Sequence, residues 1–341
     1  MKRTILISLA AGLFSIIFPI IIGLLSPLDF HEEDEPDIPP DISIVHTSPN
    51  FEAGSDGEIS VTLYHGEETL STDMHSYLTG VLAAEMPASF ETEALKAQAI
   101  AARTYTVHKI LSGRSENHPD ADICSDTSCC QAFCDESAMR EKWGENYDKN
   151  LIKINEAVLQ TDGLCAVFEN EPILAAFHSS SCGFTQASGN IWEKELPYLI
   201  PVESPENEDN VPNYVSSITV SFGEFKDTIL SEFPDAVFGE DKSTWIGEKI
   251  SDESGRTESV TIGGVSISGT ELRSLFSLRS AAIELSVTDS GIAITTTGYG
   301  HGVGLSQYGA NVLAEKGFSC EDIIAWYYTG TELKNIADVL E

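Results

Sequence analysis

Residues 74–110 read MHSYLTGVLAAEMPASFETEALKAQAIAARTYTVHKI, a helical pattern with one interruption. The apolar spacing over residues 77–82 predicts a first helix. Because proline disfavours helical geometry in the residue before it, Pro87 predicts that this helix ends at Glu85 or just before it. A second helix is expected within residues 89–105, with acidic residues in its first turn.

The break places Glu85 at a helix C-terminus between Ala84 and Met86. The negative end of the helix dipole and the apolar neighbours both favour the neutral carboxylic acid, so the pKa of Glu85 is expected to be raised. A carboxyl group still protonated near neutral pH is what a general acid requires. The alternative is an exposed terminal glutamate with an ordinary pKa.

Five alanines between residues 94 and 102 predict that the second helix packs closely against a neighbour. Gln98 and Arg103 are polar residues within this tightly packed element. Either they are solvated surface residues, or they line a cleft next to Glu85.

The composition excludes several classes of protein. The 341 residues include 19 Lys plus Arg and 54 Asp plus Glu, which gives a formal charge of −35. So acidic a surface repels phosphate backbones, and we expect no nucleic-acid partner. Because 42% of the residues are hydrophobic, the chain is expected to fold around a core rather than to be disordered.

The N-terminus predicts a membrane anchor. Lys2 and Arg3 precede an uncharged apolar stretch at 4–28, which is long enough to cross a bilayer. A cleaved signal peptide is the competing interpretation, but Pro27 occupies the place where a cleavage site would be needed. The positive residues predict a cytoplasmic segment at 1–3 and an extracytoplasmic remainder, which makes this a single-pass membrane protein. An acidic, proline-containing linker is expected at 29–57 and a folded domain at 58–341.

Beyond the first helices the chain mixes strand and helix patterns. Residues 164–177 resemble a hairpin, and a short helix is expected after Ser268. Further strands are expected at 59–63, 216–222, 260–267, 281–287 and 291–297. The predicted fold class is therefore α+β, with mixed helices, antiparallel strands and a substrate cleft, behind one N-terminal transmembrane helix.

Four of the seven cysteines fall within eleven residues, with a histidine upstream. Clustered thiols near an imidazole indicate zinc, and the expected ligands are His118, Cys124, Cys129 and Cys130. Four such ligands would close the coordination sphere and make the zinc structural. A disulfide such as Cys124 to Cys134 is the alternative.

Two other segments suggest chemistry. His178 is followed by three serines, but no nucleophile elbow surrounds them and no orienting acid is evident, so a serine nucleophile is rejected. Alternate glycines at 298–304 match no phosphate-binding motif. They predict a glycine-lined floor carrying His301, Gln307 and Tyr308, suited to a hydroxyl-rich ligand such as a sugar. A tight strand-to-helix turn is the alternative.

These motifs together resemble the stage II sporulation protein D (SpoIID) family over residues 59–337. The resemblance rests on the Glu85 motif VLAAEMP, on LKAQAIAARTY at 95–105, on the segment 192–205, and on GHGVGLSQYGA at 300–310. One departure is local, because relatives commonly read Ser-x-Gly-Gly-x-Thr where this chain has residues 181–185.

The resemblance implies a lytic transglycosylase that cuts peptidoglycan glycan strands during engulfment of the forespore. It implies a sporulation amidase (SpoIIP-like) and a membrane scaffold (SpoIIM-like) as partners, and a catalytic domain between the mother-cell and forespore membranes. It also implies that Glu85 is the catalytic acid and base, and that zinc binds in the loop after the alanine-rich helix.

One carboxyl group is sufficient for this reaction. Glycosidases that use water generally need two carboxylates. A lytic transglycosylase instead lets the 6-hydroxyl of muramic acid attack its own anomeric carbon, so Glu85 donates a proton and then accepts one. The expected substrate-positioning residues are Arg103, Tyr105, His301, Gln307 and Tyr308.

Two other classes of function are considered. A non-catalytic wall-binding protein that enhances an amidase is the first, because related sequences are described as amidase enhancers. A zinc hydrolase is the second, and it requires an open metal position with a nearby base.

Overall fold

A computed structural model of the chain describes residues 55–114, 118–192 and 194–340. The expected anchor at 4–28 and the linker residues 29–54 lie outside the described residues. Within the part of the chain that the structure describes, no helix has both the length and the apolar character needed to cross a membrane.

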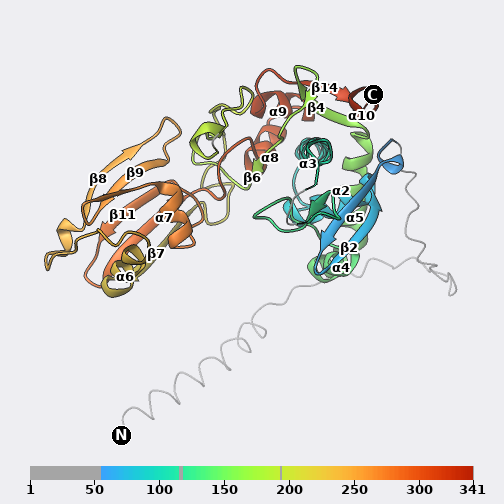
Figure 1. The fold of residues 1–341 in the computed structure, drawn as a ribbon. Coiled ribbons are helices and arrows are strands. Elements are labelled where there is room, and N and C mark those ends of the chain that lie inside the picture. The colour runs from blue at the N-terminus through green and yellow to red at the C-terminus, as the bar shows by residue number, and fades with distance from the viewer. Residues whose placement is uncertain (1–54, 115–117, 193, 341) are drawn as a thin grey trace, which may run out of the picture. The chain divides into compact units, whose positions relative to one another are not determined.

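Helix α3 is the centre of the larger hydrophobic core. It packs against four other helices and against strand β4, and its small alanine side chains permit these close approaches. Figure 1 shows α3 almost end-on, with α8 and α9 on one side and α2 and α5 on the other. These helices are α2 (Met74–Glu85), α3 (Thr92–Ser112), α5 (Tyr147–Gln160), α8 (Gln307–Glu315) and α9 (Cys320–Tyr327).

Short strands surround this helical core. A hairpin pairs β1 with β2 in antiparallel register, and β3 joins β1 in parallel. A second sheet has the order β14-β4-β5, and β6 pairs in parallel with β13. Their bounds are β1 Ser60–His65, β2 Glu68–Asp73, β3 Ile123–Cys124, β4 Leu164–Phe168, β5 Glu171–Pro172, β6 Phe177–His178, β13 Leu305–Ser306 and β14 Glu332–Asn335.

Residues 215–297 form two three-stranded antiparallel sheets around a separate core that contains Phe225 and Trp245. The strand orders are β11-β12-β7 and β10-β9-β8. The elements are β7 Val215–Ser221, α6 Phe222–Glu232, β8 Ile246–Ser251, β9 Thr257–Ile262, β10 Val265–Ile267, α7 Gly269–Leu275, β11 Ile283–Val287 and β12 Gly291–Thr297. Helix α7 begins with a capping box between Ser268 and Glu271.

The remaining described elements are short connections. They are the 3-10 turns η1 Ser55–Glu58, η2 Gly144–Asn146, η3 Ser188–Asn190 and η4 Lys242–Thr244, and the helices α4 Glu136–Trp143 and α10 Ile336–Leu340.

The α+β class with antiparallel sheets is confirmed, although two of the strand pairs are parallel. Helix α2 ends at Glu85 as expected. The single strand expected at 260–267 is instead two strands, because Gly263 and Gly264 adopt positive φ angles and turn the chain between them. In the expected hairpin only Glu171–Pro172 pairs back on β4.

Two expectations need correction at the start of the domain. The folded domain begins before residue 58, because η1 carries Asp56 into the core. There the Oδ2 of Asp56 lies 2.6 Å from an Nη of Arg103, and both side chains are 0% exposed. Arg103 also donates to the carbonyl of Leu164. Arg103 was expected to position substrate, but it is inaccessible and stabilises the fold instead.

Candidate active site

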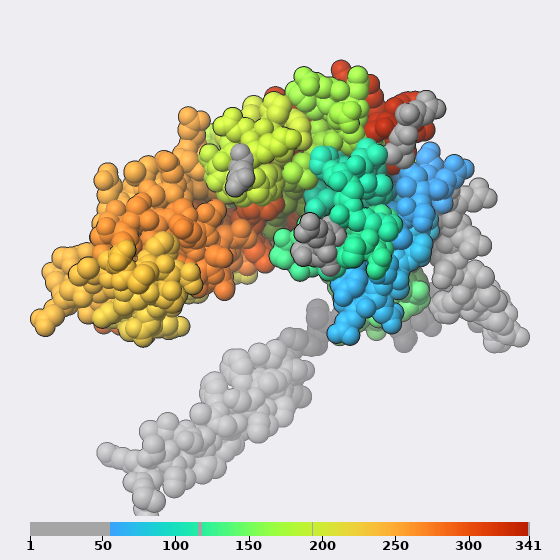
Figure 2. Space-filling view, viewed as in Figure 1, coloured from blue at the N-terminus to red at the C-terminus, as the bar shows by residue number. Residues whose placement is uncertain are grey.

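A cleft of about 730 Å³ opens beside the C-terminus of α2. Its lining comes from α2, α3, the loop 127–131, the segment 174–179, α7 and the glycine-rich segment before α8. In Figure 2 the surface is hollowed between the teal residues that follow α3 and the yellow-green and orange segments. Segments far apart in the sequence therefore build one site.

Glu85 is the only acid among the described residues that line this cleft. Its Oε1 accepts a hydrogen bond of 2.8 Å from the backbone N–H of Ala132. Its Oε2 accepts one of 3.2 Å from the side-chain amide of Gln307. The two bonds hold the carboxyl group in one orientation.

Burial raises the pKa of Glu85 above its ordinary value. The hydrogen bonds from Ala132 and Gln307 and the charge of Lys142 oppose this rise, because each favours the carboxylate. Lys142 donates to the carbonyls of Ala83 and Ala84 and so caps the negative end of α2. The direction expected from the sequence is confirmed, but burial is its principal cause.

Three of the residues expected to position substrate lie in the cleft: Tyr105, His301 and Gln307. The hydroxyl of Tyr105 donates to the carbonyl of Cys129. Tyr308 is not among the lining residues, and its ring packs edge-on against Phe90. The prediction for Tyr308 is therefore not met by this geometry.

His301 is a neutral hydrogen-bonding group. Burial and the charge of Arg273 lower the pKa of His301 to about 4. Its Nδ1 lies 3.0 Å from the backbone N–H of Val303 and accepts that proton, so the ring proton of His301 belongs on Nε2. The centroid of the His301 ring lies 5.7 Å from the centroid of the Trp192 ring.

The sequence did not identify Trp192, Arg273 and Tyr299 as site residues, yet all three line the cleft. An aromatic ring with a polar edge is suited to packing against sugar rings. No spacing rule connects these residues to Glu85, because the cleft unites them only after folding. Gln98 lies elsewhere, fully buried in α3 with no hydrogen-bond partner among the described residues.

The serine that was rejected as a nucleophile, Ser181, forms a buried hydrogen-bonded pair with His178. The Nε2 of His178 lies 2.8 Å from the hydroxyl of Ser181, and Ser181 is fully buried. The backbone N–H of Ser181 donates to Glu206. Because the hydroxyl of Ser181 does not reach the cleft, it is not placed to attack a substrate.

The glycines before α8 serve close packing. Gly298, Gly300, Gly302 and Gly304 all have positive φ angles. A Cβ atom at Gly304 would lie 2.0 Å from the carbonyl oxygen of Ala176. The segment is therefore a tightly packed turn, which was the alternative interpretation of this run, and it also carries His301 into the cleft.

Three of the four expected zinc ligands come together. The sulfur atoms of Cys124, Cys129 and Cys130 all lie within 4.8 Å of one another, and those of Cys129 and Cys130 are 3.7 Å apart. Thiolates around one tetrahedral zinc, at about 2.3 Å each, stand about 3.8 Å apart. Burial raises the pKa of Cys124 to about 12, so only a bound cation would keep it a thiolate near neutral pH. The donor set therefore fits a zinc ion.

His118 lies outside this group of sulfur atoms, and its ring stacks on that of Tyr64. The expected fourth ligand is thus not assembled. Cys134 is also outside the group, and all seven cysteines are free thiols, so the alternative disulfide from Cys124 to Cys134 is not formed in this structure.

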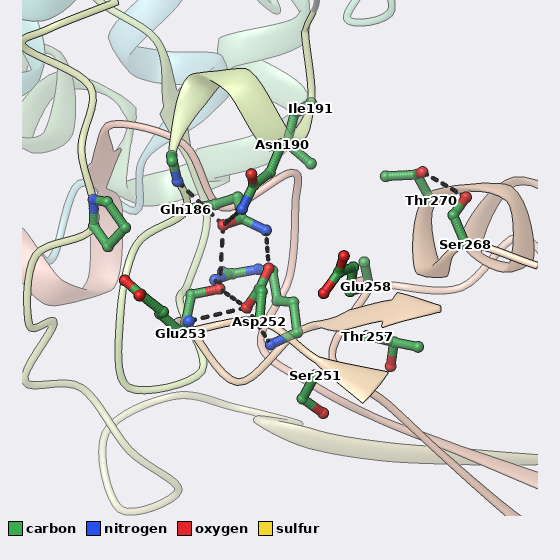
Figure 3. Close-up of a pocket in the computed structure, with 15 residues that line it drawn as sticks. Gln186, Asn190, Ile191, Ser251, Asp252, Glu253, Thr257, Glu258, Ser268 and Thr270 are labelled. Atoms are coloured by element: carbon green, nitrogen blue, oxygen red, sulfur yellow. Dashed lines mark hydrogen bonds between the residues drawn. The ribbon is translucent and has the colours of Figure 1, made fainter. Parts of the chain in front are cut away.

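A second pocket, of about 660 Å³, lies near β8 and β9 and does not include Glu85. Figure 3 shows its polar wall, where the side-chain amide of Gln186 donates to Asp252. The amide oxygen of Gln186 also accepts a hydrogen bond from the hydroxyl of Ser254. Burial opposes ionisation of Asp252, but hydrogen bonds from Ser254 and Gln186 together outweigh it and lower the pKa of Asp252, so this carboxyl group is ionised and hydrogen-bonded. This network links the turn after β8 to the segment before η3 and lacks a proton donor comparable to Glu85.

Known proteins are similar to this chain over the segments that build the site. A family model described as "Stage II sporulation protein" matches residues 66–168. Stage II sporulation protein D of Bacillus subtilis (strain 168) is 32% identical over 316 residues, which cover 91% of this chain and 90% of that protein. The chain belongs to the stage II sporulation protein D family. The namesake from Bacillus amyloliquefaciens is 36% identical over 280 residues, which cover 81% of this chain and 78% of that protein.

The resemblance of the sequence motifs to the stage II sporulation protein D family is thus confirmed, and the family is one of sporulation proteins. The matched segment carries Glu85 and the three clustered cysteines. An amidase enhancer of Bacillus subtilis (strain 168) is 28% identical over 303 residues, which cover 75% of this chain and 40% of that protein.

Proposed function

We propose that this protein is a lytic transglycosylase that cleaves the glycan strands of peptidoglycan and leaves 1,6-anhydro-N-acetylmuramic acid ends. The observation that carries the proposal is that Glu85, partly buried and with a raised pKa, is the only acid among the described residues lining the cleft. Hydrolysis by the usual glycosidase mechanisms needs two carboxyl groups across the scissile bond. One carboxyl group is sufficient for an internal transfer.

In the proposed reaction the protonated Glu85 gives its proton to the oxygen between muramic acid C1 and the next sugar. The bond from C1 to this oxygen breaks as the proton arrives. The 6-hydroxyl of the same muramic acid then forms a bond to C1, and its proton returns to the Glu85 carboxylate. No water is consumed, and Glu85 ends protonated as it began.

The surrounding residues would position the strand. Gln307 and the backbone of Ala132 orient the Glu85 carboxyl group through its two oxygens. Tyr105, whose proton goes to the carbonyl of Cys129, offers its hydroxyl oxygen as an acceptor for sugar hydroxyls. His301 and Trp192 supply aromatic faces to the cleft.

We further propose a structural zinc held by Cys124, Cys129 and Cys130. When bound, the ion would supply a fixed anchor for the loop that holds these cysteines. Ala132 follows the last of them by two residues and donates to Glu85. Fixing this loop would therefore fix one of the two hydrogen bonds that orient the catalytic acid.

The family and the N-terminal sequence support a proposal for the place of action. We propose that residues 4–28 anchor the chain in the membrane with the N-terminus in the cytoplasm, and that the catalytic domain acts between the mother-cell and forespore membranes during engulfment. The proposed partners are a SpoIIP-like amidase and a SpoIIM-like scaffold.

Mass spectrometry of glycan strands incubated with the protein tests this function. The native protein is expected to produce 1,6-anhydro-muramic acid ends, and the Glu85→Gln variant is expected to produce none, because its amide cannot donate a proton. Reducing ends from the native protein would instead establish hydrolysis and overturn the proposal.

The similarity to an amidase enhancer supports a second candidate, a non-catalytic protein that binds the wall and stimulates an amidase. Under this alternative Glu85→Gln would stimulate a sporulation amidase as well as the native protein does. An assay of amidase activity with both forms separates the two functions.

A further inference from the structure

The arginines of this chain fall into two groups. Of the six in the described residues, Arg103, Arg114 and Arg140 each form an ion pair with a carboxylate. The other three are Arg256, Arg273 and Arg279, and none of them has a carboxylate oxygen within 4.0 Å among the described residues. Because the chain has 54 acidic residues and 19 Lys plus Arg, three neighbouring arginines without an acidic partner are unexpected and indicate a binding role.

Two of these arginines border a hollow that continues the Glu85 cleft. A pocket of about 420 Å³ beside α7 is lined by Arg273, Arg279 and Tyr299 together with a leucine and small polar residues, and none of its described lining residues is an acid. Arg273 and Tyr299 line the Glu85 cleft as well. The two hollows therefore share a wall.

The guanidinium groups of Arg273 and Arg279 contact neighbouring groups, but no carboxylate among the described residues forms an ion pair with them. The Cζ of Arg279 lies 4.2 Å from the ring centroid of Tyr299, and its Nε is buried without a hydrogen-bond partner. Among the described residues, the guanidinium of Arg273 makes one hydrogen bond, of 3.4 Å, to the carbonyl of Leu278. Glu271, the acid of the same helix, is engaged by the backbone and hydroxyl of Ser268.

The charge extends behind the pocket. Arg256 is buried, and its guanidinium lies where a Cβ atom of Gly302 would stand. Burial is the main cause of the lowered pKa of His301, and the charges of Arg273 and Arg256 add to it, so His301 stays neutral. A cleft that excludes acids other than Glu85 and gathers unpaired cations is complementary to an anion.

We propose that Arg273 and Arg279 form a subsite for a carboxylate carried by the substrate. This inference rests on the proposed function, because it takes the ligand to be a peptidoglycan strand. Planar guanidinium groups bind carboxylates through paired hydrogen bonds, which matches two guanidinium groups that line an open hollow and have no carboxylate partner among the described residues. Tyr299, 45% exposed, supplies the adjoining apolar face for the sugar.

Two sources can supply this carboxylate. The lactyl group of muramic acid is a free carboxylate where the stem peptide has been removed, and the stem peptide itself carries carboxylates where it remains. The shared chemistry is a carboxylate attached close to the glycan chain, and the experiment separates the two sources.

Binding of defined strands to the full-length protein carrying Glu85→Gln tests the subsite without turnover. The probes are strands stripped of peptides, the same strands with lactyl carboxylates converted to methylamides, strands with intact peptides, and these with their peptide carboxylates amidated. We expect about tenfold weaker binding when the relevant carboxylate is neutralised. The stripped pair reports on the lactyl group and the intact pair on the peptide.

Arg273→Gln and Arg279→Gln should each weaken binding of the carboxylated probe about tenfold and leave the amidated probe unchanged. Arg140→Gln is the matched control, because it removes an exposed cation of α4 that lines neither pocket, and it should change neither affinity. Circular dichroism and thermal unfolding verify that each variant is folded, and Arg273→Lys should retain part of the affinity.

Equal affinities for carboxylated and amidated strands in both pairs would overturn the inference. So would arginine variants that weaken both members of a pair equally. Failure of the proposed function is a separate result, because it appears as missing anhydro ends in the products of the native protein.

Discussion

The side-chain amide of Gln307 donates a hydrogen bond of 3.2 Å to Oε2 of Glu85, although the two residues are 222 positions apart. Gln307 is the first residue of α8, and Glu85 is the last of α2. The contact therefore depends on α3, which packs against both helices and sets the distance between them. The orientation of the proposed acid is a property of the whole helical core.

Replacing Gln307 by alanine should lower the rate and change its pH dependence. Losing one of the two bonds that orient the Glu85 carboxyl group is expected to lower kcat about tenfold. The bond lowers the pKa of Glu85, so removing it raises that pKa further. Because a general acid must be protonated, activity falls above its pKa, and the alkaline limb of the profile should move to higher pH in the variant. The profile of kcat against pH measures both effects.

Glu315→Ala, at the exposed C-terminal end of α8, is the matched control and should leave the profile unchanged. A Gln307→Ala profile with a lower alkaline limit would contradict the assignment of Glu85 as the proton donor.

Replacing Arg103 by alanine should destabilise the protein rather than weaken substrate binding. It would leave the Asp56 carboxylate buried and unpaired, which typically costs about 3–5 kcal/mol in the free energy of unfolding. Chemical denaturation measures this change. Arg140→Ala, at an exposed ion pair on α4, should change the unfolding free energy very little.

A double variant, Asp56→Leu with Arg103→Met, should recover much of the lost stability, because two apolar groups replace two charges. Normal stability of Arg103→Ala together with lost affinity for glycan strands would restore the substrate-binding interpretation.

Arg103 also shows what the sequence could not supply. Its helix was predicted, and so was its place among alanines. Its partner, Asp56, lies 47 residues upstream in a segment whose acidity and prolines resembled a linker. Long-range ion pairs have no local signal, so a buried arginine and a cleft arginine are indistinguishable by spacing. Arg273 and Trp192 were not predicted as site residues for a similar reason, because only tertiary contacts bring them into the cleft.

Local sequence signals predicted the ends of backbone elements better than they predicted the long-range contacts of side chains. Pro87 set the end of α2, and with it the position of Glu85. Turn chemistry was harder to foresee, as at Gly263 and Gly264, where a run of alternating apolar residues continues through a reversal of direction. The cysteine cluster was visible from spacing alone, whereas the distance of His118 from it was not.

Gly304→Ala should destabilise the turn before α8 by two separate effects. Its φ of +72° costs a side chain about 1 kcal/mol, and the new Cβ would collide with the carbonyl of Ala176, which adds about 1–3 kcal/mol. Gly330→Ala, at a φ of +74° with its nearest atom 3.7 Å away, isolates the first effect. Thermal unfolding of both variants measures the difference. Equal losses would mean that the turn has room for a methyl group.

Removing zinc should loosen the loop that supports Glu85. Elemental analysis is expected to find one zinc per chain in the native protein and less in Cys124→Ser. A chelator should lower Tm by about 5 °C or more, because a structural metal stabilises only the folded state. Cys182→Ser is the matched control, since this thiol lies outside the cluster and should keep the metal. Chelation that abolishes turnover without lowering Tm would favour a zinc hydrolase instead. A Cys124–Cys134 bridge detected in a zinc-free protein would contradict the metal site, and with it the argument that the ion fixes the N–H of Ala132 against Glu85.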